Sequence, residues 1–451
     1  MLKLREGTTI VFVSDSHIGG DPGCDGFESP EELRALLEGL TDRDGPVELV
    51  LAGDFFDFLQ IGIVPENANR ASLTISRPEY EALFDALRKF REKEAKRVVY
   101  LPGNHDAESF WNPDIQKTLS ELGLVDEFAY SYLAYLKVGG EWKTIYCEHG
   151  NQLDAANIVE DYHDPLDTPL GHHVVMDFTR RVAPFGRISG GLDLSEIKMV
   201  YPLVAIPRWV AGRYFYDFVG KVASYLLLPM LFAYLVYRLA AYFVVRAATG
   251  SGEFIGRGRA FPHIHALFLD IVIFGFVILL IFAVFFLVIR HTVRRIMVTM
   301  TAGSRQRYSP AEVSQNKIRS ILNGEARLPM APDLDPTTID VFVSGHTHLP
   351  SLESVENRSG RTTVMVNSGC WLRQLQPVSP RLKGPPIFVS KFVLTYVVVS
   401  AGDAGVGVEL WEYPKPAGQR LSRVERLISW GRIPDQPSQG SKPRVRADAT
   451  V

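Results

Sequence analysis

The chain has 451 residues, a formal net charge of −3 and 46% apolar residues. This length exceeds one small core, so we expect two or three structural units. The nearly balanced net charge gives the chain no strong overall basic field, and we expect no nucleic-acid partner. The three cysteines, Cys24, Cys147 and Cys370, lack metal-type spacing and favour a reducing compartment. The first residues enter a predicted strand without an apolar leader, so we expect the catalytic part to remain in the cytoplasm.

Strands and helices are predicted to alternate along the first half of the chain. Short β-branched and apolar runs predict strands at 10–14, 47–52, 97–100 and 143–147, and later at 340–344 and 362–366. Between them, Ser29-Pro30 begins a helix, and amphipathic spacing predicts helices at 78–93 and 114–122. This alternation predicts an α/β core, whose ligands gather at the carboxyl ends of its strands.

Polar side chains that can bind metals follow these strands. The candidate ligands are Asp15, His17, Asp54, Asn104, His149, His346 and His348. Each short motif has a simple explanation as a turn, but their joint occurrence at successive strand ends indicates a metal centre. Carboxylate, imidazole and amide donors suit Mn, Fe, Zn or Mg better than a thiolate zinc site. Seven ligands suit two ions that share a carboxylate, and two ions about 3.5–4 Å apart assist in-line displacement at phosphorus.

These motifs resemble those of calcineurin-like metallophosphoesterases. The matching blocks are Asp15/His17, Gly53-Asp54 with Asp57, Gly103-Asn104-His105-Asp106, His149 and Gly345-His346-Thr347-His348. The resemblance covers roughly 1–155 and 335–412, and it implies a four-layer α/β sandwich of two mixed sheets flanked by helices. It also implies that Asp15, His17, Asp54 and His348 hold one divalent ion, and that Asp54, Asn104, His149 and His346 hold the other.

The same resemblance implies a reaction and two catalytic residues. A hydroxide held between the ions would attack phosphorus, His105 would protonate the leaving oxygen, and Asp57 would orient His105. Within the superfamily, the Gly-Asp-Phe-Phe-Asp and His-Thr-His-Leu-Pro blocks are most similar to UDP-2,3-diacylglucosamine pyrophosphohydrolases. The chain departs from those enzymes at Asn151, where they usually carry aspartate, and at His105, where they often carry arginine.

A long insertion, which we place at 156–334, separates His149 from His346. Ile271–Ile289 contains no charged or hydrogen-bonding side chain, and as a helix it would measure about 28 Å, close to a bilayer core of about 30 Å. Because His149 and His346 must meet, the chain has to cross an even number of times, so we predict a helical hairpin with spans at 222–245 and 267–289. Basic flanks predict a cytoplasmic catalytic part, with about 247–265 outside. Arg238 and Asp270 are expected to lie near the same end of antiparallel helices, where they could pair or snorkel.

Other parts of the insertion and the tail carry weaker expectations. Asp161–Asp164 and His172-His173 could line a substrate cleft or bind nothing, and the arginines at 180, 181 and 187 could meet phosphate or lie on a solvated surface. Trp209, Tyr214, Phe215 and Tyr216 suit a membrane interface. The core is expected to resume at 335–413, and the Pro-, Ser-, Gly- and Arg-rich segment 414–451 is expected to be mostly disordered, apart from a short surface helix at 423–430.

The sequence therefore predicts a membrane-anchored, dinuclear-metal phosphoesterase. Its substrate would be a phosphomonoester, phosphodiester or pyrophosphate, and a hairpin beside the site favours a lipid-linked one. Two alternatives remain open: a soluble nucleotide or phosphoprotein substrate with the hairpin only as an anchor, and a non-catalytic metal-binding scaffold. The hairpin itself has an alternative, an amphipathic lid that lies on the membrane.

Overall fold

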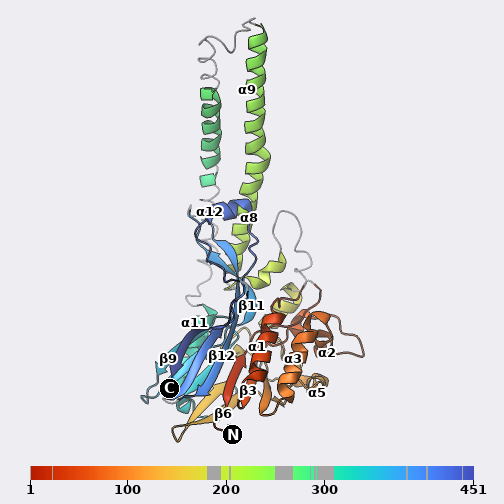
Figure 1. Ribbon diagram of the computed structural model, residues 1–451, viewed down its shortest axis with the longest axis vertical. Coiled ribbons are helices and arrows are strands. Elements are labelled where there is room, and N and C mark those ends of the chain that lie inside the picture. The colour runs from red at the N-terminus through yellow and green to blue at the C-terminus, as the bar shows by residue number, and fades with distance from the viewer. Residues whose placement is uncertain are drawn as a thin grey trace.

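The computed structural model describes residues 2–22, 24–179, 194–202, 205–248, 268–284, 286–288, 291, 309–381, 384–402, 405–438 and 440–451. Two mixed sheets pack face to face (Figure 1). One sheet has the order β1 (Leu2–Lys3), β6 (Tyr132–Val138), β7 (Glu141–Cys147), β8 (Val341–Ser344), β10 (Thr362–Asn367) and β9 (Ser351–Glu356). The other has the order β14 (Arg444–Thr450), β13 (Val406–Glu412), β12 (Ile387–Ala401), β2 (Thr9–Val13), β3 (Val47–Ala52), β4 (Lys96–Leu101) and β5 (Glu127–Phe128), and β11 (Trp371–Val378) pairs with β12.

The predicted four layers are confirmed by how the core divides. Alternate residues of β2 face opposite ways, as strand geometry requires: Ile10 and Phe12 pack between the sheets, whereas Val11 and Val13 pack under the helices. The helices on that face are α1 (Pro30–Asp42), α2 (Arg70–Ile75), α3 (Glu81–Glu92), α4 (Glu108–Trp111) and α5 (Pro113–Glu121). On the far side, α11 (Pro310–Leu322) covers the other sheet through Ile318 and Leu322.

The strand directions bring the polar loops together. β2, β3 and β4 are mutually parallel, and β7 is parallel to β8, which is parallel to β10. The loops after β2, β3 and β4 therefore lie at one edge of their sheet, and the loops after β7 and β8 lie at one edge of the other. The two edges face each other across the sandwich, as the hydrogen bond from the His346 amide to Asp15 shows.

The insertion forms a projection above this sandwich. After α6 (Leu170–His173), α8 (Ile206–Val222), a π-helical turn (Ala223–Leu227) and α9 (Leu228–Ala248) form one continuous rod (Figure 1). The π-turn ends two residues before Pro229, which lacks an amide hydrogen and disturbs the hydrogen bonding of a regular α-helix. A second helix, Phe268–Val288, lies beside α9, and Arg238 and Asp270 form an ion pair, which is one of the two arrangements expected from the sequence.

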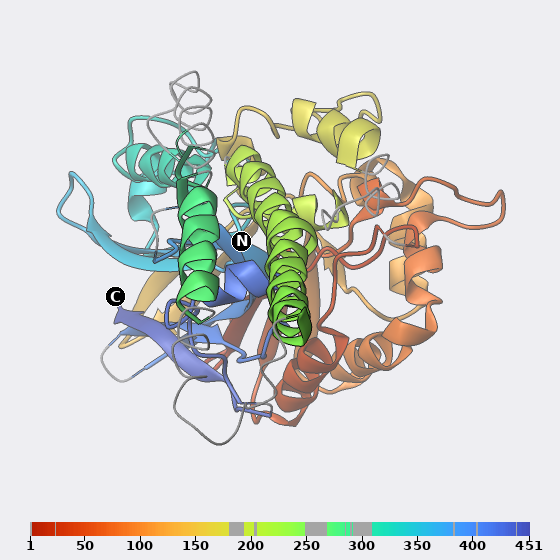
Figure 2. The same cartoon turned by 90° about the horizontal axis from the view of Figure 1, so that it is seen from above.

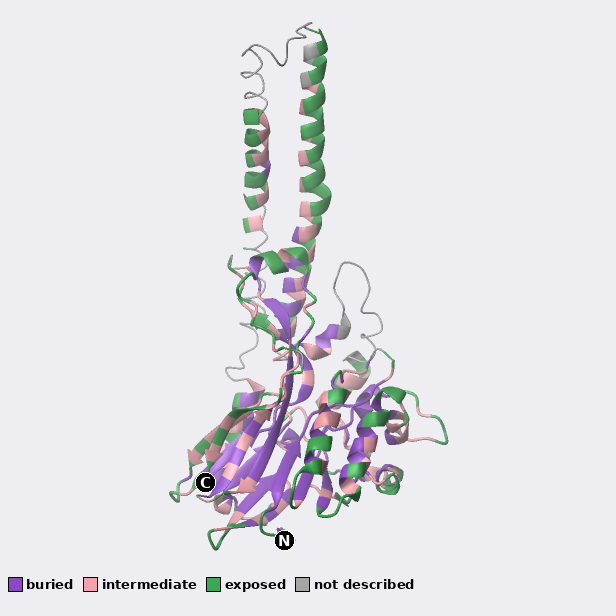
Figure 3. Cartoon of the chain, viewed as in Figure 1, coloured by how far each residue is buried: buried purple, intermediate pink, exposed green. Residues whose placement is uncertain are grey.

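Both rods have the length and composition of membrane spans. The candidate spans are Ile206–Ala241 and Phe268–Val288. The most apolar 18 residues of the two have mean hydropathies of 1.7 and 3.4, and only 6% of each such stretch is buried. Their outward surfaces are exposed along almost the whole projection (Figure 3). Residues 249–265 of the predicted outer loop, the three arginines at 180, 181 and 187, and the basic flank after the second helix at 290, 294, 295, 305 and 307 lie outside the described residues.

Two expectations from the sequence are wrong. Trp209, Phe215 and Tyr216 are not interfacial side chains, since they are 0%, 3% and 1% exposed; α8 packs them against β12 and its surroundings, and only Tyr214 points outward. The segment after 414 is ordered where it is described: it forms α12 (Arg423–Ile428), and β14 pairs along β13.

Candidate metal centre

The backbone at the strand ends is strained where the candidate ligands lie. In the described chain, the non-glycine residues with positive φ are Asp15 (52°), His17 (49°), Asp54 (50°), His346 (65°), His348 (55°) and Ala95 (59°). Such a conformation costs free energy in an L-residue, and strained residues cluster at functional sites. Five of these six residues are candidate ligands, so the strain gathers at one place in the fold.

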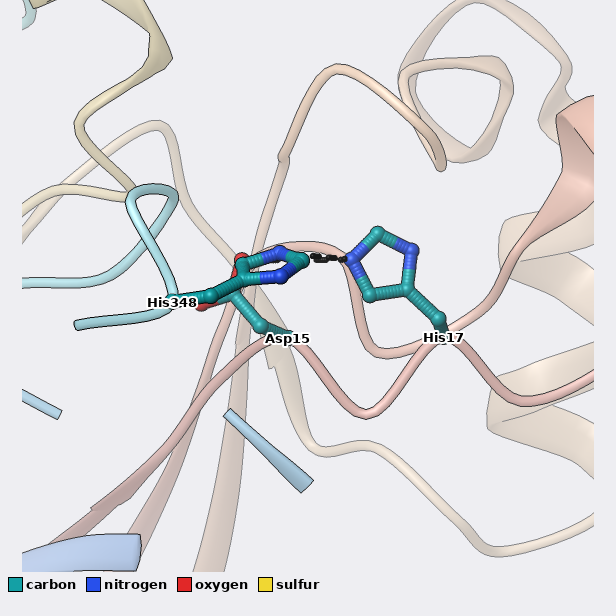
Figure 4. Close-up of side chains that lie close together, drawn as sticks. All are labelled: Asp15, His17 and His348. Carbon is teal, nitrogen blue, oxygen red and sulfur yellow. Dashed lines mark hydrogen bonds and ion pairs between the residues drawn. The ribbon is translucent and has the colours of Figure 1, made fainter. Parts of the chain in front are cut away.

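One group of side chains joins β2 to the loop after β8. His348 Nε2 lies 3.2 Å from Asp15 Oδ1, and His17 Nε2 lies 3.2 Å from His348 Nε2 (Figure 4). His17 Nε2 also lies 3.7 Å from Asp54 Oδ2. Two donor atoms that share an ion at about 2.1 Å are about 3 Å apart, so these separations suit a common ion.

A second group lies on the other side of Asp54. His149 Nε2 is 3.3 Å from Asp54 Oδ2, and His346 belongs to the same cluster of ligand atoms. The other ring nitrogen of His149 donates to the Ala52 carbonyl at 2.9 Å, which turns Nε2 towards the cluster, where it could bind an ion after losing its proton. Asp54 therefore lies between the two groups, where a bridging carboxylate is expected.

The donor set fits two divalent cations. Asn104 Oδ1 and His149 Nε2 are buried without a hydrogen-bond partner in the protein. Buried polar atoms are normally satisfied, and an ion would satisfy both. The pairing of His17 Nε2 with His348 Nε2 likewise brings two lone-pair donors together in a way that a cation stabilises. No thiolate takes part, so the set suits Mn, Fe, Zn or Mg.

Glycines allow the loops to approach this closely. A Cβ at Gly103 would lie 2.1 Å from Asp54 Oδ1, one at Gly53 would lie 2.5 Å from the His149 ring, and one at Gly345 would lie 2.4 Å from Asp15 Oδ2. Each glycine thus borders a candidate ligand from another loop. The Gly-Asp, Gly-Asn and Gly-His pairs of the sequence motifs are explained by this contact.

The electrostatics of the cluster favour positive charge. Burial alone raises the pKa of Asp54, but the neighbouring His149 and His105 hold that pKa well below its usual range. Burial opposes charging of His149, yet the carboxylates of Asp54 and Asp15 raise its pKa to about 10. The two buried carboxylates therefore remain ionised and attract cations.

His105 is hydrogen-bonded to Asp57, the residue that the family resemblance expects to orient it. His105 Nδ1 donates to Asp57 Oδ1 at 2.9 Å. Burial lowers the pKa of His105, but the Asp57 and Asp54 carboxylates outweigh it and raise that pKa to about 9. Asp57 Oδ2 also lies 3.6 Å from His17 Nδ1, so one carboxylate contacts both the candidate acid and a candidate ligand.

Asp106 links two loops of the site. Its carboxylate accepts hydrogen bonds from the Gly103 amide at 2.7 Å, the Phe55 amide at 2.9 Å and the Tyr100 hydroxyl at 2.6 Å. Burial, together with the charge of Asp54, raises the pKa of Asp106 to about 6. These contacts assign Asp106 to holding the loops after β3 and β4 in register.

Sequence reasoning missed three residues at the site. Asp154 Oδ2 lies 3.3 Å from His346 Nε2, Tyr201 stacks on His348 with ring centroids 6.4 Å apart, and Lys198 lines the adjoining cavity. All three come from the insertion or its border, where no strand-end motif draws attention. Asn151, which replaces the usual aspartate, instead receives a hydrogen bond from Tyr162 and donates to the Asn157 carbonyl.

A cleft of about 720 Å³ opens directly onto the cluster. Asp54, Asn104, His105, His346 and His348 form its polar end. Its other walls are largely apolar, from the insertion (Leu170, Val174, Val175, Val200) and from β11 and its approach (Leu349, Leu372, Pro377). The histidines at 172 and 173 do not line this cleft, although His172 borders a smaller neighbouring cavity.

The fold and the donor set define a phosphoesterase-type metal centre. Residues 8–182 match the family model of the calcineurin-like phosphoesterases, a family of metal-dependent phosphoric ester hydrolases that use a dinuclear divalent metal centre. Comparison with curated proteins finds no match. The matched region contains Asp15, His17, Asp54, Asn104 and His149, whereas His346 and His348 come to the site through the tertiary fold. The closer similarity to UDP-2,3-diacylglucosamine pyrophosphohydrolases stays a prediction.

Proposed function

We propose that this protein is a membrane-anchored phosphoesterase that hydrolyses an amphipathic, lipid-linked phosphoester on the cytoplasmic side. The observation that carries the proposal is the shape of the cleft: it begins at the metal-ligand cluster and continues between apolar walls. A ligand that fills it would place a phosphate at the polar end and an apolar group along Leu170, Val200 and Leu372.

The residues have separate tasks in this reaction. The two ions, held as the resemblance implies by Asp15, His17, Asp54 and His348 and by Asp54, Asn104, His149 and His346, would activate water and neutralise charge on the phosphoryl oxygens. His105, with its raised pKa, is protonated at neutral pH and faces the cleft, where it can donate a proton to the leaving oxygen. Asp57 holds its ring, and the apolar walls exclude water.

The course of the cleft supports a substrate that comes from a bilayer. Gln374, Gln376 and Pro377 line it along β11, the strand that runs from the metal centre towards the base of the projection (Figure 1). The insertion packs on this strand, as the bridge between Val200 and Leu375 shows. A lipid-linked substrate could thus reach the ions while its apolar part follows β11.

A matched pair of variants tests the substrate class. Leu170 and Leu166 are both exposed, at 67% and 83%, but only Leu170 lines the cleft. Leu170→Asp should lower kcat/KM about tenfold for an acylated phosphoester, since about 60 Å² of apolar contact is worth ~1.5 kcal/mol. It should leave a short-chain ester with the same reacting group unaffected, and Leu166→Asp should change neither. Aspartate suits the first turn of α6, so the helix should persist.

The assay uses the full chain in detergent, loaded in turn with Mn, Fe, Zn or Mg. Equal losses on both substrates would argue against an acyl-binding wall. A wild-type enzyme that prefers soluble nucleotides or phosphopeptides over every acylated ester would replace the lipid substrate with the alternative, in which the hairpin only anchors the enzyme. If the protein bound stoichiometric metal but hydrolysed no phosphoester, the remaining alternative would be a non-catalytic metal-binding scaffold.

A further inference from the structure

The short helix α12 presents large apolar side chains to solvent at an unusual place. Leu427 is 71% exposed and Trp430, just after the helix, is 73% exposed. On the opposite side, Leu421 and Ile428 are buried against α8. In Figure 1 the helix lies across the base of the projection, and viewed from above it lies between the two apolar rods (Figure 2).

Contacts place α12 at the level where the second apolar helix ends. Phe282 and Phe286 of that helix pack against the cluster that contains Phe215, Leu421 and Ile428. The rings of Phe215 and Phe286 are 5.5 Å apart. If Phe268–Val288 crosses a bilayer, Phe286 lies at its cytoplasmic boundary, and α12 lies at that boundary too.

Buried polar contacts hold α12 in this position. Arg213 of α8 forms ion pairs with Glu425 at 3.3 Å and with Glu196 at 3.1 Å, and all three side chains are at most 10% exposed. The Ser422 and Glu425 side chains form a capping box at the helix start. At its end, the Arg381 amide donates to the Ile428 carbonyl at 3.0 Å. The exposed side chains are therefore presented by a fixed helix and not by a loose tail.

The charge around α12 is strongly positive. The exposed basic residues of this segment and the adjacent turn are Arg381, Arg420, Arg423, Arg426 and Arg432. The one acid between 420 and 432, Glu425, is buried in its pair with Arg213, and Arg420 reaches Glu196 at 3.5 Å. Arg381 also lies 6.0 Å from the Trp430 ring centroid. Tryptophan beside arginines is the composition of a bilayer interface with anionic headgroups.

We propose that α12 and Trp430 form a membrane-docking platform that binds anionic lipid headgroups. The platform rests on the proposed function, since it needs the hairpin to cross the bilayer. The platform would fix the distance between the metal centre and the membrane surface. The two are connected by the β11–β12 strand pair, which runs from Trp371 opposite Leu394 to Val378 opposite Ile387 and measures about 23 Å at 3.3 Å per residue. The cleft follows this strand pair, so the platform would keep its outer end at the lipid surface.

Depth-dependent quenching tests the platform in the full chain. The three native cysteines are buried, so Leu427→Cys can be labelled selectively with an environment-sensitive fluorophore. The labelled protein is placed in lipid nanodiscs that carry a nitroxide either near the headgroup or near the end of the acyl chain. Leu235→Cys, on the exposed side of α9, reports the hairpin, and Ser359→Cys, in the turn between β9 and β10, reports the solvated far part of the protein.

The headgroup nitroxide should quench the Leu427→Cys label about twofold, because an interfacial apolar side chain enters about 5–10 Å. The acyl-chain nitroxide should quench Leu235→Cys, and neither should quench Ser359→Cys. Quenching at Leu427→Cys should be stronger with phosphatidylglycerol than with phosphatidylcholine, and Arg423→Glu with Arg426→Glu should remove that difference.

The outcomes separate the two proposals. Quenching at Leu235→Cys without quenching at Leu427→Cys would overturn the platform while leaving the hairpin intact. A Leu427→Cys label that is shielded from water but insensitive to nitroxide would show that protein covers α12, which also overturns it. Equal quenching in both lipids would overturn the preference for anionic headgroups. Absence of quenching at both positions would remove the hairpin itself.

Discussion

Asp57→Asn separates the charge of the carboxylate from its role as a hydrogen-bond acceptor. The amide oxygen can still accept from His105 Nδ1 across the present 2.9 Å, so the ring should keep its orientation. What changes is the charge that helps to raise the pKa of His105 to about 9 from its ordinary 6.5, a difference equivalent to ~3.4 kcal/mol in favour of the protonated ring.

The expected shift follows from the sources of that raised pKa. Burial acts against protonation, and Asp57 is the strongest of the groups that favour it, ahead of Asp54. Loss of the Asp57 charge should therefore remove about half of the difference, and lower the pKa of His105 by ~1–1.5. A general acid works only while protonated, so activity is present below its pKa and is lost as the pH rises through it. The alkaline limb of kcat/KM should move down by the same amount.

The assay compares two phosphoesters over a pH series. With an alkyl leaving group, Asp57→Asn should show the shifted limb, and His105→Ala should lose roughly 10²–10⁴ in rate. With a nitrophenolate leaving group, which needs no proton, both losses should shrink. Metal content must be measured alongside, because Asp57 also contacts His17. An unmoved limb, with equal losses on both substrates and full metal content, would refute the acid role and assign His105 to binding the phosphate.

Three further changes test the metal cluster and the scaffold. Asp54→Asn should lose metal and turnover together, because its carboxylate lies between both ligand groups; retention of two metal equivalents would contradict the bridge. Gly103→Ala should displace Asp54 and lower metal occupancy, because the new Cβ would lie 2.1 Å from Asp54 Oδ1. The control is Gly39→Ala on α1, where no atom lies within 4 Å of the new Cβ. This variant should keep its metals and stabilise the fold by about 0.5–1 kcal/mol. Arg361→Ala should lower the free energy of unfolding by ~3 kcal/mol, because it removes the bidentate partner of the Asp340 carboxylate, which is 1% exposed. Thermal melts measure this loss. An unchanged melting temperature would mean that Lys143 and water are enough to compensate the Asp340 charge.

The sequence by itself determined the core strands and the residue types at their ends. A β-branched, largely apolar run such as Thr9–Val13 has one stable environment, a strand buried on both faces, and the polar residues after it must then lie at the sheet edge. The apolar helix is equally legible, because residues 271–288 form an uninterrupted run without charged or hydrogen-bonding side chains that is long enough for a candidate membrane span. These features depend on local composition, and local composition is readable from one chain.

Contacts between distant segments decided the rest. The tail looked disordered because its composition is polar, yet β14 alternates small apolar residues, Ala447 and Ala449, which pack on the core, with charged ones that face solvent. Trp209 and Tyr216 looked interfacial because aromatic residues beside arginine suit a bilayer surface and a buried helix face alike; packing of α8 on β12 chose the second. Likewise the positive φ angles, the link through Asp106 and the apolar cleft arise only when loops from both sheets meet, since no single segment contains the partners that impose them.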